Sequence, residues 1–247
     1  MKIRIDKLLV DRKLVPSRER AQALILAGRV LVNDQKIEKA GSAVESDAEV
    51  RLIGSDLKYV SRGGLKLEAA LCHWKIDVRG RICLDVGAST GGFTDCLLQH
   101  GAAKVIAIDT GYGQVDLRLR QDPRVRLLEK TNARYLKPEN IAEAVSLIVV
   151  DVSFISATLV LPAVIAATPP AQTLRGKQII VLVKPQFEAG REHVGKGGIV
   201  RDPAAQVAAL EKIRTKLIEF GCTLIDSIES PILGAEGNRE FLLYGEF

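Results

Sequence analysis

Short apolar segments alternate with helical segments from about residue 60 to the end of the chain, and this alternation constrains the fold more than any other feature. Strands that alternate with helices pair in parallel, because each helix returns the chain to the starting edge of the sheet. The pattern therefore predicts an α/β domain whose mostly parallel sheet has helices on both faces and ligands at the carboxyl ends of its strands. The predicted strands are residues 82–86, 105–109, 125–129, 147–151, 179–184, 223–227 and 239–244.

Four helical segments lie between these strands, at residues 92–100, 139–144, 156–167 and 203–220. Asp202 is the expected N-cap of the last helix, because its carboxylate can accept from free backbone N–H groups, and Pro203 suits the first helical position. The last predicted strand follows a glycine-rich turn, and we expect it to close the edge of the sheet as a hairpin.

The first 57 residues have a different pattern and predict a small α+β domain, followed by the larger domain over residues 58–247. A short helix is expected over residues 6–14, ending before Pro16, and Ser17 is the expected cap of a second helix that stops at Gly28. Alternating residues predict strands near 30–32 and 49–53, with a turn at Asn33-Asp34. Residues 54–56 are the predicted linker.

The positive charge of the chain is concentrated in this first domain. The formal net charge is +5, and residues 1–39 alone contain ten Lys or Arg against five Asp or Glu. Clustered guanidinium and ammonium groups on short helices are suited to phosphates, so the sequence predicts nucleic-acid binding. A solvated basic face without a partner is the alternative.

Several classes of protein are excluded by what the sequence lacks. The first residues are charged where a signal peptide needs an apolar segment, and the longest apolar stretch is too short to span a bilayer, so we expect a cytoplasmic protein without a membrane anchor. The four cysteines form no C-x-x-C pair, so neither a metal site nor a disulfide framework is expected. Aromatic residues make up 4% of the chain, which argues against a carbohydrate groove.

A glycine-rich turn follows the strand at residues 82–86 and opens the next helix. Its spacing, G-x-x-x-G-G from Gly87 to Gly92, differs from the dinucleotide fingerprint, and no Lys-Ser or Lys-Thr follows as in a phosphate loop. Asp109 ends the next strand about 20 residues on, where an acid can bind ribose hydroxyls. The turn and this acid together predict a cofactor that contains adenosine; an ordinary turn with a capping acid is the alternative.

Residues 4–34 resemble the RNA-binding domain first seen in ribosomal protein S4. The resemblance implies that this domain binds structured RNA through phosphates and shape. The basic residues it points to, together with one just beyond the linker, are Arg4, Arg12, Lys13, Arg18, Arg20, Arg29 and Arg62.

The segment L-D-V-G-A-S-T-G-G-F-T-D, residues 84–95, resembles the glycine motif of the FtsJ-like RNA ribose methyltransferases. It departs from that motif at Thr90, where the family often has proline, and at Phe93, where it has tryptophan. The resemblance implies a Rossmann-like class I methyltransferase domain that binds S-adenosylmethionine. The resemblance implies Gly91, Gly92 and Phe93 along the methionine side, Asp109 at the ribose and Asn132 at the adenine. The other residues implied for the cofactor are Gly87, Ser89 and Asp151.

That family also carries a Lys-Asp-Lys-Glu tetrad, which matches Lys66, Asp151, Lys184 and Glu240 in order. Each residue has an ordinary structural alternative: a helix-surface charge, a strand-end cap, an edge lysine and a salt-bridge partner. A ribose 2′-hydroxyl must lose its proton as it attacks a methyl group, so a neutral lysine is needed as base. Burial and Lys66 favour neutral Lys184, whereas Asp151 and Glu240 favour its charged form, and the sequence leaves this balance open.

The two resemblances together cover nearly the whole chain and point to the TlyA family, whose members methylate a ribose 2′-hydroxyl of ribosomal RNA and are often named hemolysins. The expected partner is ribosomal RNA or a ribosomal subunit, and the sequence sets neither the modified nucleotide nor the oligomeric state. A non-catalytic assembly factor and a cytolysin are the alternatives; the intact tetrad disfavours the first and the charged N-terminus the second. The loop at residues 190–198 either covers the substrate or is a plain surface loop.

Overall fold

The computed structural model describes residues 2–15, 17–53, 58–168, 176–234 and 237–247. The chain forms two compact units, Met1–Asp56 and Leu57–Phe247. The predicted linker at residues 54–56 lies outside the described residues, and so does Pro16. None of the helices in the described ranges has the length and hydropathy of a membrane span.

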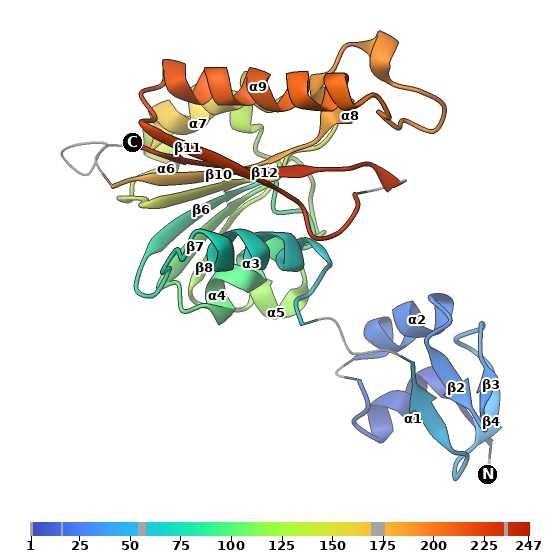
Figure 1. The fold of residues 1–247 in the computed structure, drawn as a ribbon. Coiled ribbons are helices and arrows are strands. Elements are labelled where there is room, and N and C mark those ends of the chain that lie inside the picture. The colour runs from blue at the N-terminus through green and yellow to red at the C-terminus, as the bar shows by residue number, and fades with distance from the viewer. Residues whose placement is uncertain (1, 16, 54–57, 169–175, 235–236) are drawn as a thin grey trace. The chain divides into compact units, whose positions relative to one another are not determined.

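The second unit is built on a seven-stranded sheet with the order β11-β12-β10-β9-β6-β7-β8 (Figure 1). The five strands from β8 to β10 are parallel, as predicted, and β12 pairs antiparallel with both β10 and β11. The strands are β6 (Ile82–Val86), β7 (Lys104–Ile108), β8 (Val125–Leu128), β9 (Leu147–Val150), β10 (Gln178–Val183), β11 (Leu224–Glu229) and β12 (Phe241–Glu246).

The prediction that the last strand closes the sheet edge is wrong, although the hairpin exists. β12 lies inside the sheet and β11 is the edge strand. The reason is burial: Leu242, Leu243 and Tyr244 of β12 are buried, whereas Leu224 of β11 is more than half exposed. The more apolar strand takes the position that is covered on both sides.

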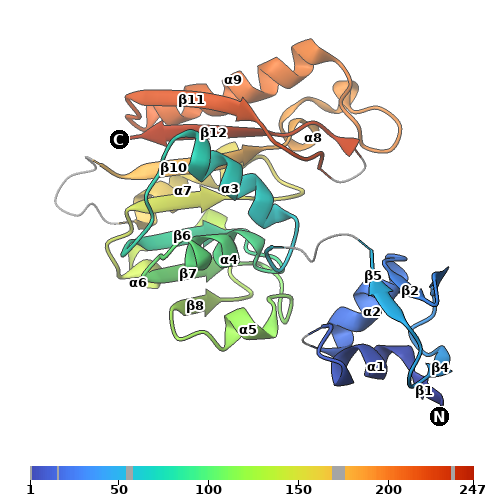
Figure 2. The ribbon, with the colours of Figure 1, turned by 60° about the horizontal axis from the view of Figure 1, so that its bottom comes forward.

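Helices cover both faces of this sheet (Figures 1 and 2). One apolar core lies between the sheet and α3, α4 and α5, and the other between the sheet and α6, α7 and α9. The bounds are α3 (Gly63–His73), α4 (Gly92–Gln99), α5 (Leu117–Arg120), α6 (Pro138–Ile141), α7 (Leu161–Ala167), α8 (Pro185–Glu188) and α9 (Pro203–Glu219), with 3₁₀ turns η1 (Ala133–Tyr135), η2 (Ala157–Leu159) and η3 (Arg191–His193).

The helix at α9 agrees with its prediction, since Asp202 accepts from Ala204 N at 2.9 Å and Pro203 occupies the first turn. Two other predicted helices are shorter than expected. The one at residues 139–144 ends at Ile141 because Ala142 has a φ of +54°. The one at residues 156–167 divides into η2 and α7, with Pro162 in the first turn of α7, where its missing N–H breaks no hydrogen bond. The helix α3 was not predicted.

The first unit packs two helices against two small sheets, one pairing β1 with β4 and the other ordered β3-β2-β5. Ser17 Oγ accepts from Arg20 N and caps α2, as predicted, and Gly28 follows that helix with a φ of +65°. The first helix stops three residues earlier than expected because Lys13 adopts a φ of +57°. The bounds are β1 (Lys2–Arg4), α1 (Ile5–Asp11), α2 (Arg18–Leu26), β2 (Val30–Val32), β3 (Gln35–Lys36), β4 (Ala43–Glu45) and β5 (Val50–Leu52).

Candidate active site

The glycine turn between β6 and α4 lies at the carboxyl end of the parallel strands. Gly87 and Gly91 have φ values of +90° and +98°, which favour glycine over other residues. A Cβ on Gly87 would lie 2.3 Å from the carbonyl oxygen of Asp151, so the turn passes directly against the end of β9. A Cβ on Gly92 would lie 2.2 Å from Ser61 Oγ. Close backbone packing therefore requires a glycine at position 87, whereas at Gly92 the nearest group is the Ser61 side chain.

The turn encloses a buried acid, Asp85, on β6. Its Oδ2 accepts from Thr94 Oγ1 at 2.6 Å, while Oδ1 has no hydrogen-bond partner among the described residues. Burial raises the pKa of Asp85 to about 7, and the charges of Asp151 and Asp109 act in the same direction. A neutral carboxyl group beneath the turn is therefore accessible near physiological pH.

A cavity of about 540 Å³ opens between the ends of β6, β7 and β9. Asp109 accepts from Ser89 N at 2.8 Å and from Gly111 N at 2.6 Å, so its carboxylate joins the glycine turn to the loop after β7. Asn132 Oδ1 accepts from Arg134 N and caps η1. The wall also includes Gly87, Ser89 and Asp151, together with apolar groups from Val86, Ile108, Ala133, Ile155 and Val160.

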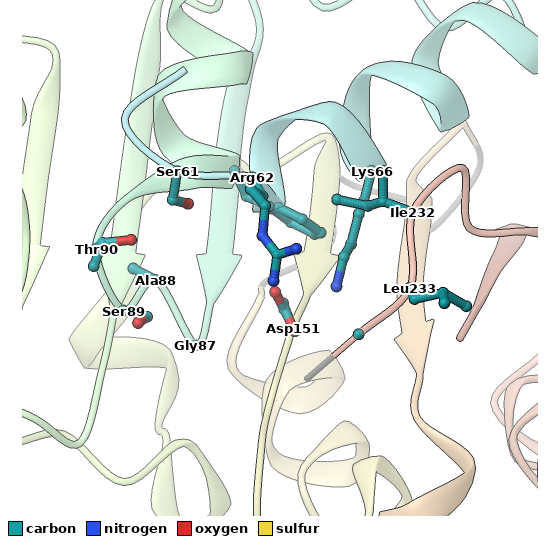
Figure 3. Close-up of a pocket in the computed structure, with 14 residues that line it drawn as sticks. Ser61, Arg62, Lys66, Gly87, Ala88, Ser89, Thr90, Asp151, Ile232 and Leu233 are labelled. Atoms are coloured by element: carbon teal, nitrogen blue, oxygen red, sulfur yellow. The ribbon is translucent and has the colours of Figure 1, made fainter. Parts of the chain in front are cut away.

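A second cavity of about 250 Å³ lies on the other side of the same turn and shares Gly87, Ser89 and Asp151 with the first. It is lined by the cations of Arg62 and Lys66 (Figure 3). The Arg62 side chain points toward Asp151 in this view. Gly92 and Phe93 also line it, whereas Gly91 lines none of the site cavities and packs on Leu119.

The four residues of the tetrad form two ion pairs. Lys184 Nζ lies 2.6 Å from Asp151 Oδ1, at the ends of the neighbouring strands β10 and β9. Lys66 of α3 pairs with Glu240, which precedes β12 and is only 2% exposed. A third cavity, of about 470 Å³, is lined by Lys66, Lys184 and Glu240. The structure thus brings together four side chains that lie far apart in the sequence.

Val194 and Gly198 of the loop at residues 190–198 also line the third cavity, beside Phe154 and Phe187. The Phe154 side chain is 93% exposed, although its ring contacts Phe187 with ring centres 5.4 Å apart. Its φ of +64° is unusual for a large side chain. This residue therefore presents an aromatic surface at the rim of the site.

The loop that carries Phe154 is fixed to α8 by Glu188, a buried carboxylate. Glu188 accepts from Ser156 Oγ at 2.5 Å and from Ala157 N at 2.7 Å, and Lys212 Nζ lies 3.2 Å from its Oε2. Glu188 therefore links the segment after β10 to the loop after β9 through hydrogen bonds.

Several of the arginines predicted to bind RNA also bind groups of the first unit. Arg4 and Arg18 both donate to Asp6, which is fully buried and whose pKa they hold well below its usual range. Arg12 donates to the carbonyl oxygens of Ser46 and Ala48 at 2.6 and 2.7 Å, and Arg29 donates to that of Ile53. Lys13 is exposed and Arg20 half-buried, whereas Arg62 belongs to the second unit.

Sequence reasoning missed two features of the second unit. One is Ser153, whose hydroxyl accepts from Lys184 Nζ at 2.7 Å; its place two residues after Asp151 was the available signal. The other is a basic and aromatic surface on the loops after β7 and β8. There Lys130 lies over the ring of Tyr112 and Arg134 over that of Tyr135, and both tyrosines are about 70% exposed.

Among the described residues, no three His, Cys, Asp or Glu side chains are grouped closely enough to hold a metal ion. The strand order, the glycine turn after the first parallel strand and the acid after the second define a class I methyltransferase fold.

Comparison with known proteins gives the family. Residues 59–247 match the FtsJ-like methyltransferases and residues 3–50 match the S4 domain. The chain is 44% identical over 242 residues to the 16S/23S rRNA (cytidine-2′-O)-methyltransferase TlyA of Mycobacterium tuberculosis, covering 98% of this chain and 88% of the relative. It is 41% identical over 244 residues to Hemolysin A of Brachyspira hyodysenteriae, covering 98% and 99%.

A solved structure also covers both units: a hemolysin from Streptococcus thermophilus is 42% identical with a TM-score of 0.74, covering 99% of this chain and 88% of that one. The chain therefore belongs to the TlyA family of FtsJ-like methyltransferases with an N-terminal S4 domain.

Proposed function

We propose that this protein transfers a methyl group from S-adenosylmethionine to a ribose 2′-hydroxyl of ribosomal RNA. The observation that carries the proposal is the meeting of two buried lysine–carboxylate pairs beside a cavity suited to a nucleoside. The TlyA relative of Mycobacterium tuberculosis, 44% identical, is named for this reaction at cytidine. Such a substrate would place the enzyme in the cytoplasm.

The two cavities at the glycine turn fit the cofactor chemically. The larger one offers apolar walls for a base and the Asp109 carboxylate for ribose hydroxyls, and Asn132 also lines it. The smaller one offers Arg62 and Lys66, whose positive charges suit the carboxylate of the methionine part. The part of the cofactor that lies between the two cavities would contact Gly87, Ser89, Gly92 and Phe93. Gly91 would maintain the conformation of the turn.

The bound cofactor would supply an electrophilic methyl group on a positively charged sulfur. Lys184 is the proposed base that takes the proton of the attacking hydroxyl, because it faces the third cavity and is only 9% exposed. Asp151 would orient the Lys184 amine, and Lys66 with Glu240 would hold the ribose beside it. The remaining rate gain would come from alignment of the reacting groups.

The proposed division of labour assigns RNA binding to residues 1–57 and methyl transfer to residues 58–247. The basic residues of the first unit would contact phosphates with the parts of their side chains that are exposed. The second unit also has exposed aromatic rings that are suited to stack on bases around the target nucleotide: Tyr112, Tyr135 and Phe154. The cations beside the two tyrosines, Lys130 and Arg134, are suited to phosphates.

The proposal is tested with purified full-length protein, labelled S-adenosylmethionine and ribosomal subunits from cells that lack the gene. We expect transfer of label to one or a few nucleotides, mapped as 2′-O-methyl riboses by mass spectrometry. The Lys184→Ala variant should lose transfer while its cofactor affinity stays within a few fold, and Lys216→Ala, at a half-buried lysine of α9 that lines none of the three cavities, should behave as wild type. Absence of ribose methylation with every subunit and with naked RNA would refute the proposal.

A further inference from the structure

The amine of Lys184 is held by two neighbours that both belong to the loop after β9. Its Nζ lies 2.6 Å from Asp151 Oδ1 and donates to Ser153 Oγ at 2.7 Å. Ser153 is itself exposed, and its hydroxyl lines the same cavity of about 470 Å³ as Lys184. Because Ser153 bonds the proposed base at the wall of this cavity, it can influence how the base meets a substrate.

We propose that Ser153 is a positioning residue that aims the lone pair of Lys184 at the substrate hydroxyl; this rests on the function proposed above. A neutral lysine amine has two N–H groups and one lone pair in a tetrahedral arrangement. Ser153 accepts an N–H of this amine, and the Asp151 carboxylate is paired with it at 2.6 Å. These two contacts leave the lone pair free to point into the cavity that Lys184 lines, where a hydroxyl group can meet it.

A single acceptor would not achieve this, because the amine could still rotate about its Cε–Nζ bond. The Ser153 hydrogen bond and the Asp151 ion pair together restrict this rotation, and both contacts persist when the amine becomes an ammonium. The charged groups near this amine are Asp151, which pairs with it, and Lys66 and Glu240, which line the same cavity; Arg62 points toward Asp151 (Figure 3). Loss of the Ser153 hydroxyl changes none of these charges, so its effect falls on alignment.

In the reaction, the hydroxyl oxygen forms its bond to the methyl carbon while the carbon–sulfur bond breaks and leaves its electron pair on sulfur. The hydroxyl proton passes to the Lys184 lone pair, so the positive charge of the sulfonium reappears on the ammonium. The attacking oxygen and the lone pair must therefore be aligned at the same moment. Misalignment lowers kcat without weakening the binding of either substrate.

The loop that carries Ser153 is built to hold such a position. Phe154, the next residue, has the left-handed φ of +64°, and Glu188 binds Ser156 and Ala157 farther along the loop. Because the Ser153 side chain is exposed, removing its hydroxyl leaves no cavity in the core. The Ser153→Ala variant is therefore expected to fold.

The first test measures steady-state kinetics of the full-length enzyme on ribosomal subunits. In Ser153→Ala we expect kcat to fall about tenfold or more, with the KM values for S-adenosylmethionine and for subunits within about twofold. Ser153→Thr keeps a hydroxyl and should recover most of kcat. Ser227→Ala removes a hydroxyl from the edge strand β11 and should match wild type.

A second readout needs no activity: ¹³C relaxation of the Lys184 ε-methylene in the protein alone should show greater mobility in Ser153→Ala than in wild type or Ser153→Thr. An unchanged kcat in Ser153→Ala, a change in KM alone, or a Lys184 side chain equally ordered in all three proteins would overturn the role of Ser153. If wild type methylates no RNA, the proposed function fails instead, and the relaxation measurement still decides whether Ser153 holds Lys184.

Discussion

Among single residues, Asp109 shows most clearly how one side chain serves both the fold and the proposed cofactor. Its two carboxylate oxygens accept from Ser89 N and Gly111 N, which joins the glycine turn to the loop after β7. Each carboxylate oxygen has further lone pairs, and the group lines the larger cavity. Ribose hydroxyls would therefore meet an acceptor that the backbone already holds in place.

We predict that Asp109→Ala weakens S-adenosylmethionine binding by about 1.5–3 kcal/mol, because charge-assisted hydrogen bonds are lost. Calorimetry with the purified protein measures this. Asp122→Ala is a matched control, since Asp122 also accepts from a backbone N–H two residues on and lies outside that cavity. Equal affinities of wild type and Asp109→Ala would remove Asp109 from the cofactor site.

A second prediction at this scale concerns Asp85 and pH. The pKa of Asp85 is about 7 in the folded protein and near 3.8 when unfolded. Between pH 4 and 7 the unfolded chain gives up this proton while the folded protein keeps it, so Asp85 lowers the free energy of unfolding as pH rises, by up to about 1.4 kcal/mol per pH unit. Above pH 7 both states are charged and the effect is constant.

Asp85→Asn removes this titration. Denaturant unfolding of the second unit should therefore show the stability of the variant, relative to wild type, rising from pH 4 to pH 7 and then staying level. A relative stability that does not depend on pH over this range would mean that the Asp85 carboxyl is charged throughout.

At the scale of elements, the glycine turn depends on two separate constraints at Gly87. Its φ of +90° is unfavourable for any other residue, and its Cα faces the Asp151 carbonyl so closely that a Cβ would lie 2.3 Å away. Gly80 has a similar φ of +71°, but a Cβ there meets nothing within 4 Å. A substitution at Gly80 therefore tests backbone strain alone, whereas one at Gly87 tests strain together with a steric clash.

We predict that Gly87→Ala weakens cofactor binding more than tenfold and lowers stability by several kcal/mol, because β6 and β9 must move apart at the site. Gly80→Ala should cost about 1 kcal/mol of stability and leave cofactor affinity unchanged. Thermal unfolding and calorimetry on both variants give the comparison. Similar losses in the two would show that strain alone matters at Gly87.

The strands were predicted closely because each is an apolar run between turn signals, as at β6, whose predicted and observed bounds agree. The helix α3 was missed because it begins with Gly63 and Gly64, and glycine disfavours helices. In the structure a Cβ on Gly64 would lie 2.3 Å from the Tyr59 ring, so close packing compensates for the poor propensity. Packing of this kind depends on residues that local patterns do not connect.

At the scale of the whole chain, the motifs predicted which residues gather at the candidate site but not how they pair. Lys66 and Glu240 are 174 residues apart and meet only because the start of α3 and the segment before β12 lie at the same edge of the sheet. In the first unit, charge alone could not reveal that buried Asp6 binds both Arg4 and Arg18. Part of the basic excess thus stabilises the unit itself.

The remaining basic residues of the first unit provide a test of RNA binding. We expect the Lys13→Gln, Arg20→Gln double variant to bind ribosomal RNA with a weaker salt dependence, its log–log slope falling by roughly one unit per lost phosphate contact. Arg12 and Arg18 stay unchanged because they hold groups of the first unit.

The matched control is Lys75→Gln, Lys216→Gln, which removes the same charge at the ends of α3 and α9 that lead into β6 and β11, opposite the candidate site. Filter binding between about 50 and 200 mM salt gives both slopes. Long-range attraction depends on net charge, so a loss of net charge alone would lower the salt-dependence slopes of the two double variants equally. Phosphate contacts in the first unit would lower only the slope of the Lys13, Arg20 variant. Equal slopes for the two double variants would mean that Lys13 and Arg20 make no phosphate contacts and belong to a solvated surface.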